Sequence, residues 1–313
     1  MSDAQPDCPD RQACPAPARP AAEELPEALA RASTLCLSCH TCRLDCTVHV
    51  ATGRLQPLRL VRLAVTGNLA ALLRHPALWS CVQCNRCAAT CPMQVAPAAL
   101  VRRLRRQALA SGAVPLETLE RREVLAAGLQ RVRWQMVARC LAGDDPAAFA
   151  ADWPRWAEAP VGSGGQPAAA AAVVALPAVD AAAPGPGSGR QALDALCGHG
   201  GELAACMTCR ECSTACPVAG DPAVFDPAAI LRQVNLGLTE ELLASPSIWL
   251  CLGCRSCSEA CSQAVAGHLV VEGLQELALR QGRVPADLRQ RLWAFEQAVY
   301  TRFLNEIERL LGG

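Results

Sequence analysis

Residues 81–91 read CVQCNRCAATC, a run of the form C-x2-C-x2-C-x3-C. Its first three cysteines are close enough in sequence for three thiolates to point inward from one tight loop and hold three irons of a cubane. The fourth cysteine leads out of the loop, and in ferredoxins with two clusters it binds the neighbouring cluster. The run therefore predicts a [4Fe–4S] site that takes part of its ligand set from elsewhere in the chain.

The same spacing occurs four times in the chain. The other runs are CLSCHTCRLDC at 36–46, CMTCRECSTAC at 206–216 and CLGCRSCSEAC at 251–261. A shift of 170 positions places the first run on the third and the second on the fourth, and it also places Trp79 on Trp249. A register kept without a gap indicates a tandem duplication of one module.

The pairing predicted by this spacing is reciprocal within each module. In the first module the ligand sets are Cys36, Cys39, Cys42 with Cys91, and Cys81, Cys84, Cys87 with Cys46. In the second module they are Cys206, Cys209, Cys212 with Cys261, and Cys251, Cys254, Cys257 with Cys216. All of these cysteines are expected to bind metal, in four [4Fe–4S] clusters, and none is assigned a catalytic role. Because paired loops share ligands, metal binding and folding are expected to be coupled.

The segments between the runs have the periodicity of helices. Val270, Leu274 and Ala278 recur at i, i+4 and i+8, and the first module repeats this pattern. Longer helices are predicted over 116–141 and 286–311. We therefore expect a mainly α fold, with two tandem α-helical ferredoxin domains that are each wrapped around two clusters.

Four regions are predicted along the chain. They are a disordered N-terminal segment at 1–22, a first dicluster module at 23–142, a linker at 143–191 and a second dicluster module at 192–313. The linker assignment rests on an Ala-, Gly- and Pro-rich composition, because such a segment cannot bury enough apolar area to offset its ordering entropy. Within it, only Ala168–Val179 is considered for a short strand or helix.

Charge and hydropathy argue against several classes of protein. A formal net charge of zero gives no reason to expect nucleic-acid binding. The longest apolar run, Ala168–Leu176, is too short to cross a bilayer, and the first twenty residues lack the apolar stretch of a secretory signal. Twenty cysteines without such a signal are typical of a reducing compartment. We therefore expect a cytoplasmic protein whose cysteines bind metal.

Features around the runs extend the likeness beyond a small ferredoxin. Cys46 and Cys81 lie 35 positions apart, the gap ends in Trp-x-Cys, and a helix ending in Gly-x-Val-Pro follows the second run; the second module repeats all three features. In these respects the chain resembles the C subunit of heterodisulfide reductase, over about residues 25–142 and 192–311.

That resemblance implies an electron-transfer subunit. Its partners would be a flavin-containing A-like subunit and a B-like subunit whose Cys-Cys-Gly motifs carry out disulfide or related thiol chemistry. This sequence contains no Cys-Cys-Gly motif, so the chain is not expected to be catalytic alone.

Two other interpretations stay open. The dicluster domain also occurs in iron–sulfur subunits similar to those of glycolate, lactate and glycerol-3-phosphate oxidoreductases, although those also carry Cys-Cys-Gly domains. Four-cysteine sets also bind structural zinc, usually from two C-x2-C knuckles. A zinc-stabilised interaction scaffold is therefore the alternative from another class.

Several residues have no counterpart in the other module and are interpreted as incidental. Such cysteines are Cys8, Cys14, Cys140 and Cys197, and Cys140 is expected to pack within a helix. The histidines also lack counterparts, so none is predicted to bind metal. Arg102, Arg103, Arg105 and Arg106 form a basic run. We interpret that run as a solvated helix face, with a docking patch for an acidic partner as the alternative.

Overall fold

The protein is described by a computed structural model covering residues 24–143, 203–219 and 225–312. The described residues are 69% helical and contain no strand, which confirms the predicted mainly α fold. Among the described helices, none combines the length and the hydropathy that crossing a bilayer requires. The predicted N-terminal segment, the linker with Ala168–Val179, and Cys8, Cys14 and Cys197 lie outside the described residues.

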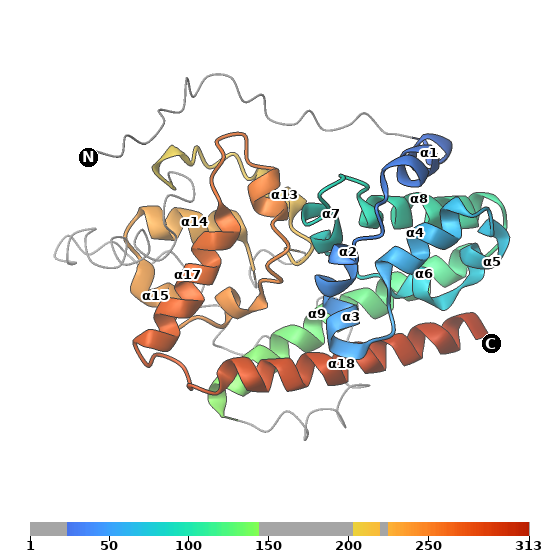
Figure 1. Ribbon diagram of the computed structural model, residues 1–313. Helices are drawn as coiled ribbons and strands as arrows, with labels where there is room; N and C mark the ends of the chain where they lie inside the picture. Colours follow the sequence, from blue (N-terminus) through green and yellow to red (C-terminus); the bar gives the residue numbers. More distant parts are fainter. Residues whose placement is uncertain (1–23, 144–202, 220–224, 313) are drawn as a thin grey trace, which may run out of the picture.

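The first module contains the first two cysteine runs (Figure 1). Its shorter helices are α1 (Leu25–Leu35), α2 (Thr41–Leu44), α3 (Thr47–Thr52), α4 (Pro57–Val65), α5 (Leu69–Arg74), α6 (Pro76–Ser80) and α7 (Arg86–Ala89). Two longer helices follow, α8 (Pro97–Ala110) and α9 (Leu116–Ala142). The long helix predicted over 116–141 is therefore present and ends one residue later.

The second module repeats this order. It comprises η3 (Leu203–Ala205), α13 (Glu211–Ala215), α14 (Pro227–Asn235), α15 (Thr239–Leu243), η4 (Pro246–Leu250), α16 (Ser256–Glu259), α17 (Gly267–Arg280) and α18 (Leu288–Gly312). By the shift of 170 positions, α4 corresponds to α14, α6 to η4, α7 to α16, α8 to α17 and α9 to α18. The helix predicted over 286–311 is present as α18.

The helix between the two runs of each module shows how the sequence sets its boundaries. Pro57 and Pro227 occupy the first positions of α4 and α14, where a missing N–H costs no helical hydrogen bond. Gly67 and Gly237 lie just past the C-caps with φ of +83° and +79°, a left-handed conformation that glycine adopts without steric cost. In both helices the C-cap residue therefore directly precedes a glycine.

The apolar positions predicted from periodicity form the core. They are Leu100, Leu104 and Ala108 in α8 and Val270, Leu274 and Ala278 in α17, and all are buried. Trp79 and Trp249 are buried as well, each directly before a cysteine loop. Burial of these faces holds the helices against the loops that carry the cysteines.

The two long helices exchange partners between the modules. α9 and α18 lie side by side (Figure 1), α9 packs on η4 of the second module, and α18 packs on α3 and α6 of the first. Since these pairs are counterparts, the α9–η4 and α18–α6 contacts mirror each other, as in an isologous dimer interface. Arg54 adds a hydrogen bond across the modules, to Asn305 Oδ1 at 2.7 Å. The cysteine loops of both modules are thus mounted on one continuous core.

Candidate metal centres

All four cysteine runs share one backbone conformation. In each run the two residues that flank the second cysteine have positive φ, between 55° and 67°. Seven of these eight residues are not glycine: Ser38, His40, Gln83, Asn85, Thr208, Arg210 and Arg255. A left-handed residue with a side chain costs about 1–2 kcal/mol, and such strain persists only where the surroundings impose it. Strain at the same positions of four loops marks them as functional sites.

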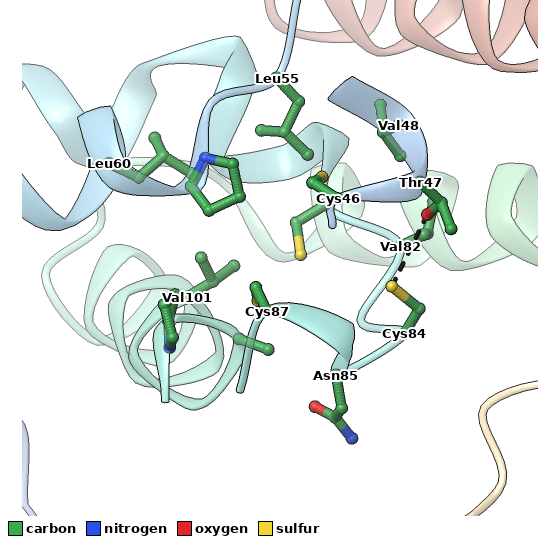
Figure 2. Close-up of a pocket in the computed structure, with 14 residues that line it drawn as sticks. Cys46, Thr47, Val48, Leu55, Leu60, Val82, Cys84, Asn85, Cys87 and Val101 are labelled. Carbon is green, nitrogen blue, oxygen red and sulfur yellow. Dashed lines mark hydrogen bonds between the residues drawn. The ribbon is translucent and has the colours of Figure 1, made fainter. Parts of the chain in front are cut away.

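The second run of the first module closes a cavity together with the end of the first run. Cys81, Cys84 and Cys87 line this cavity with Cys46. Figure 2 shows Cys46 reaching it from one loop and Cys84 and Cys87 from the other, with apolar side chains around them. The structure thus brings together the four cysteines that spacing grouped. We call this set the inner site of the first module.

A second cavity in the first module holds the complementary set. Cys36, Cys39, Cys42 and Cys91 line it together. Cys91 comes from the second run, so the predicted exchange of fourth cysteines is seen in both directions. Cys39 is exposed here, whereas Cys42 is buried. We call this set the outer site of the first module.

The cysteines of the predicted inner set of the second module also lie near one another. Burial raises the pKa of Cys251 to about 12, and the neighbouring Cys257, Cys254 and Cys216 thiols add to the rise. These four form the inner site of the second module.

The outer site of the second module consists of Cys206, Cys209, Cys212 and Cys261. Burial raises the pKa of Cys212, and the neighbouring Cys206 thiol contributes to that rise. Cys209 is exposed and Cys261 is half-buried. The structure therefore places Cys206 beside Cys212, and the binding of metal by all four outer cysteines stays a prediction.

Several of the buried thiols are held in the protonated form at neutral pH while no metal is bound. Burial raises the pKa of Cys46 to about 12 and that of Cys42 and Cys216 to about 11. At Cys39 the shift has the opposite direction, because the Thr41 hydroxyl, at 3.3 Å from its sulfur, lowers its pKa. Metal binding therefore has to displace protons from the buried thiols whose pKa is raised.

The charges around the inner site of the first module suit an electron-rich group. Arg105 and Arg122 are 6% and 4% exposed, and both donate to the Cys81 carbonyl oxygen, at 2.8 and 2.7 Å. Their one acidic partner in the described residues is Glu123, which binds Arg122 from the surface. Buried cations are costly unless negative charge lies nearby. Thiolates holding an iron–sulfur cluster would supply that charge, so the residues present fit the cofactor.

Polar groups also approach the cysteine sulfurs. The Thr47 hydroxyl lies 3.6 Å from Cys84 Sγ (Figure 2), and the Gln83 amide donates to Cys81 Sγ at 3.4 Å. In the second module the Gly253 backbone N–H donates to Cys251 Sγ at 3.4 Å. Hydrogen bonds to ligand sulfurs are one of the means by which a protein sets the reduction potential of a cluster.

Across the described residues, no three His, Cys, Asp or Glu side chains converge as a single metal ion would require. A cubane spreads its four ligands over four irons, and the paired cavities have cysteines arranged around them in this way.

One interpretation of the basic run needs correction. Arg105 does not belong to a solvated face or a docking patch, because it is buried and donates to Leu78 O and Cys81 O. Arg102 is exposed but bonds Gln83 and Asn85 of the inner loop. Two arginines of the run, Arg102 and Arg105, therefore hold the inner loop through hydrogen bonds. Spacing alone did not reveal this role, nor that of Thr47.

Three of the residues without counterparts, Cys140, His75 and His268, occupy structural positions. Cys140 is 1% exposed in the core of α9, which agrees with its predicted packing role. The His75 ring accepts a hydrogen bond from the Ala77 backbone N–H, and the His268 ring bonds the Ser258 hydroxyl at 2.6 Å.

Comparison with known proteins agrees with this geometry. Two family models, each described as a 4Fe–4S dicluster domain, match residues 26–96 and 202–265. The chain carries two 4Fe–4S dicluster domains. Together they imply four [4Fe–4S] clusters, so this is an iron–sulfur protein built from a duplicated module.

The chain is also similar to a curated protein of Archaeoglobus profundus, whose name describes it as like the C subunit of heterodisulfide reductase. The two are 31% identical over 101 residues. The match covers 31% of this chain and 54% of the relative, so the chain spans about half the length of the relative it matches. No solved structure shows significant similarity to this chain.

Proposed function

We propose that this chain is the electron-transfer subunit of a heterodisulfide-reductase-like complex. It would carry electrons between a flavin-containing A-like subunit and a B-like subunit with Cys-Cys-Gly motifs. The observation that carries the proposal is the pairing of an inner and an outer four-cysteine cavity within one module. A cytoplasmic location is part of the proposal and rests on the cysteine-rich composition.

The sixteen cysteines named above are the proposed ligands of the four clusters. When bound, such clusters supply one-electron redox chemistry. The chain's own contribution is to fix their positions. Cys46 follows the first loop and completes the set of the second, and Cys91 follows the second loop and completes the set of the first. This exchange holds the two sites of the module side by side.

The outer sites have the features of contact points for redox partners. The second cysteine of the outer run is exposed in both modules, as Cys39 and Cys209. Two positions earlier lie Leu37 and Met207, apolar side chains that are 68% and 61% exposed. An exposed apolar side chain beside a redox site favours close docking of another protein, because its burial contributes to binding.

The thiol chemistry is proposed to occur on a partner. This sequence contains no Cys-Cys-Gly motif, and each inner or outer set has four cysteines available. Substrate binding at a cluster would need an open coordination position, and a full ligand set offers none.

Purification of the chain from its native host under anaerobic conditions tests the proposal. We expect a flavoprotein and a Cys-Cys-Gly protein to co-purify. We also expect reduced flavoprotein to bleach the visible absorption of the loaded chain. A chain that purifies with zinc and without colour would contradict the proposal, as would one that reduces a disulfide without any partner.

A further inference from the structure

The solvent exposure of the second cysteine of each run differs between the inner and outer sites. Cys39 and Cys209, in the outer runs, are exposed, whereas Cys84 and Cys254, in the inner runs, are each 7% exposed. The position is the same in all four runs, so the loops themselves do not explain the burial. What covers the inner pair is the opposite module.

A small apolar cluster spans the two inner loops. Cys84, Leu252 and Cys254 are its buried members, and Val82 and Val218 pack against it. Val82 and Leu252 are counterparts, as are Cys84 and Cys254. The two inner sites therefore meet through corresponding residues of each module, at one apolar contact.

Polar contacts hold this junction in place. Arg86 at the start of α7 donates to the Leu252 carbonyl oxygen at 2.8 Å, and its guanidinium is anchored by Asp45 at 3.1 Å. Helix α7 also contacts its counterpart α16. On the second-module side, the Cys254 thiol bonds the Ser256 hydroxyl at 3.4 Å. Ser256 is the counterpart of Arg86, so the arginine contact comes from the first module alone.

The two exchanged helices, α9 and α18, also reach residues beside the junction. Tyr300 of α18 is 1% exposed and lies near Thr47, which itself contacts Cys84. In the opposite direction, Arg133 of α9 reaches the Leu250 carbonyl oxygen, directly before Cys251, at 3.4 Å. Each module thus contributes a long helix, α9 or α18, that packs beside the inner site of the other module.

We propose that the Cys84–Leu252–Cys254 contact is the crossing point between the modules, so that the four cysteine sets form one line. The order is outer site of the first module, its inner site, inner site of the second module, and its outer site. This inference rests on the proposed function and adds an internal path to it. Passage across the junction is a one-electron exchange in which one inner site is oxidised as the other is reduced, with no bond broken and no proton moved.

The test uses the full chain with both outer sites disabled. Cys36→Ser, Cys39→Ser, Cys206→Ser and Cys209→Ser leave the two inner sets complete, so about eight irons per chain are expected. In the fully reduced protein, electron paramagnetic resonance should show the splitting or broadening of two interacting spins. Adding Cys254→Ser and Cys257→Ser is the matched control, and it should leave one isolated signal. Two isolated, superimposed signals before that addition would overturn the inference.

A second comparison uses the intact ligand set, in case the multiple variant does not assemble. Arg86→Ser introduces the residue of the second module and removes the hydrogen bond to Leu252. Arg102→Ser removes contacts to the same loop that stay within the first module. We expect full iron content in both, with a changed spin–spin interaction only in Arg86→Ser. An interaction unchanged in Arg86→Ser would contradict the junction. Failure of the proposed function would look different, because the chain would then lack clusters or fail to exchange electrons with partners.

Discussion

The inner sites of the two modules have the same cysteine skeleton but different surroundings. In the first module, two buried arginines donate to the Cys81 carbonyl oxygen. Their counterparts in the second module are Gln275 and Leu292. Gln275 keeps one equivalent contact, to the Ile248 carbonyl oxygen at 2.7 Å, but carries no charge. The duplication has therefore preserved the positions of the ligands while changing the charge beside them.

Because the charges beside the two inner sites differ, we expect their reduction potentials to differ. Positive charge beside a site favours the reduced state, because reduction adds negative charge. The first module has Arg105 and Arg122 around Cys81, whereas the second has Arg133, whose charge is shared with Glu296 at 3.3 Å. We expect the inner site of the first module to hold an electron more tightly.

The largest effect is expected from removing a ligand at the junction. Cys84→Ser and Cys254→Ser should each cost one cluster, about four irons per chain, because a cubane lacking one thiolate is poorly held. The losses should be equal, since the two residues are counterparts. Iron and acid-labile sulfide assays measure this. Cys140→Ser, at a cysteine that is also buried but far from the runs in sequence, should retain all of the iron.

The next effect concerns the pH dependence of the metal-free chain. Burial raises the pKa of Cys46 to about 12 and that of its counterpart Cys216 to about 11, above the usual value of 9.0. Between pH 9 and the raised pKa values the unfolded state loses these protons and the folded state keeps them. The free energy of unfolding should therefore fall as pH rises through this window.

Chemical denaturation at several pH values measures this fall. It should be larger for Cys46 than for Cys216, as Cys46→Ala and Cys216→Ala variants would reveal. The loaded chain is the control, because its thiolates are bound to iron and have no proton to lose. A metal-free chain equally stable at pH 8 and pH 11 would contradict the assignment of these thiols as buried and protonated.

A smaller effect is expected from exchanging the charged residues between modules. Arg105→Gln and Arg122→Leu convert the first module to the residues of the second. Each should lower the reduction potential of the inner site of the first module, on the order of 50–100 mV, where about 59 mV is a tenfold change for one electron. Redox titration followed by electron paramagnetic resonance measures the potential. Arg106→Gln, exposed on the same helix, should leave it unchanged.

The smallest effect is expected at Thr47. Its hydroxyl contacts Cys84 Sγ, whereas the counterpart position holds Pro217, which has no hydroxyl. Thr47→Val should lower the potential of the inner site by roughly 20–60 mV, the equivalent of one hydrogen bond. Ser262, which also follows the last cysteine of a run, is exposed, so Ser262→Ala should have no effect. Equal shifts in the two variants would show that the Thr47 contact is unimportant.

Much of the fold could be predicted from the sequence, because its causes are local. Cysteine spacing of two and three residues defines the loops, and apolar residues at helical intervals predicted the buried faces of α8 and α17. Gly67 and Gly237 end α4 and α14 in the left-handed conformation that glycine accepts.

The surroundings of the sites could not be predicted in the same way, because they depend on distant segments. Arg105 looked like part of a solvated basic run, yet its carbonyl partners Leu78 and Cys81 lie more than twenty residues away. One signal was available: Arg105 corresponds to Gln275, so a polar residue occupies this position in both modules. The packing of α9 and α18 on the opposite modules could not be predicted from the sequence. A helix would bury the same apolar stripe against either module.

The number of electrons that one loaded chain accepts tests directly whether it holds four clusters. In an anaerobic reductive titration of the full chain, with iron determined on the same sample, we expect about four electrons and about sixteen irons per chain. Uptake of about two electrons with about eight irons would leave one module without its clusters. Protein that holds zinc and accepts no electrons would contradict the account altogether.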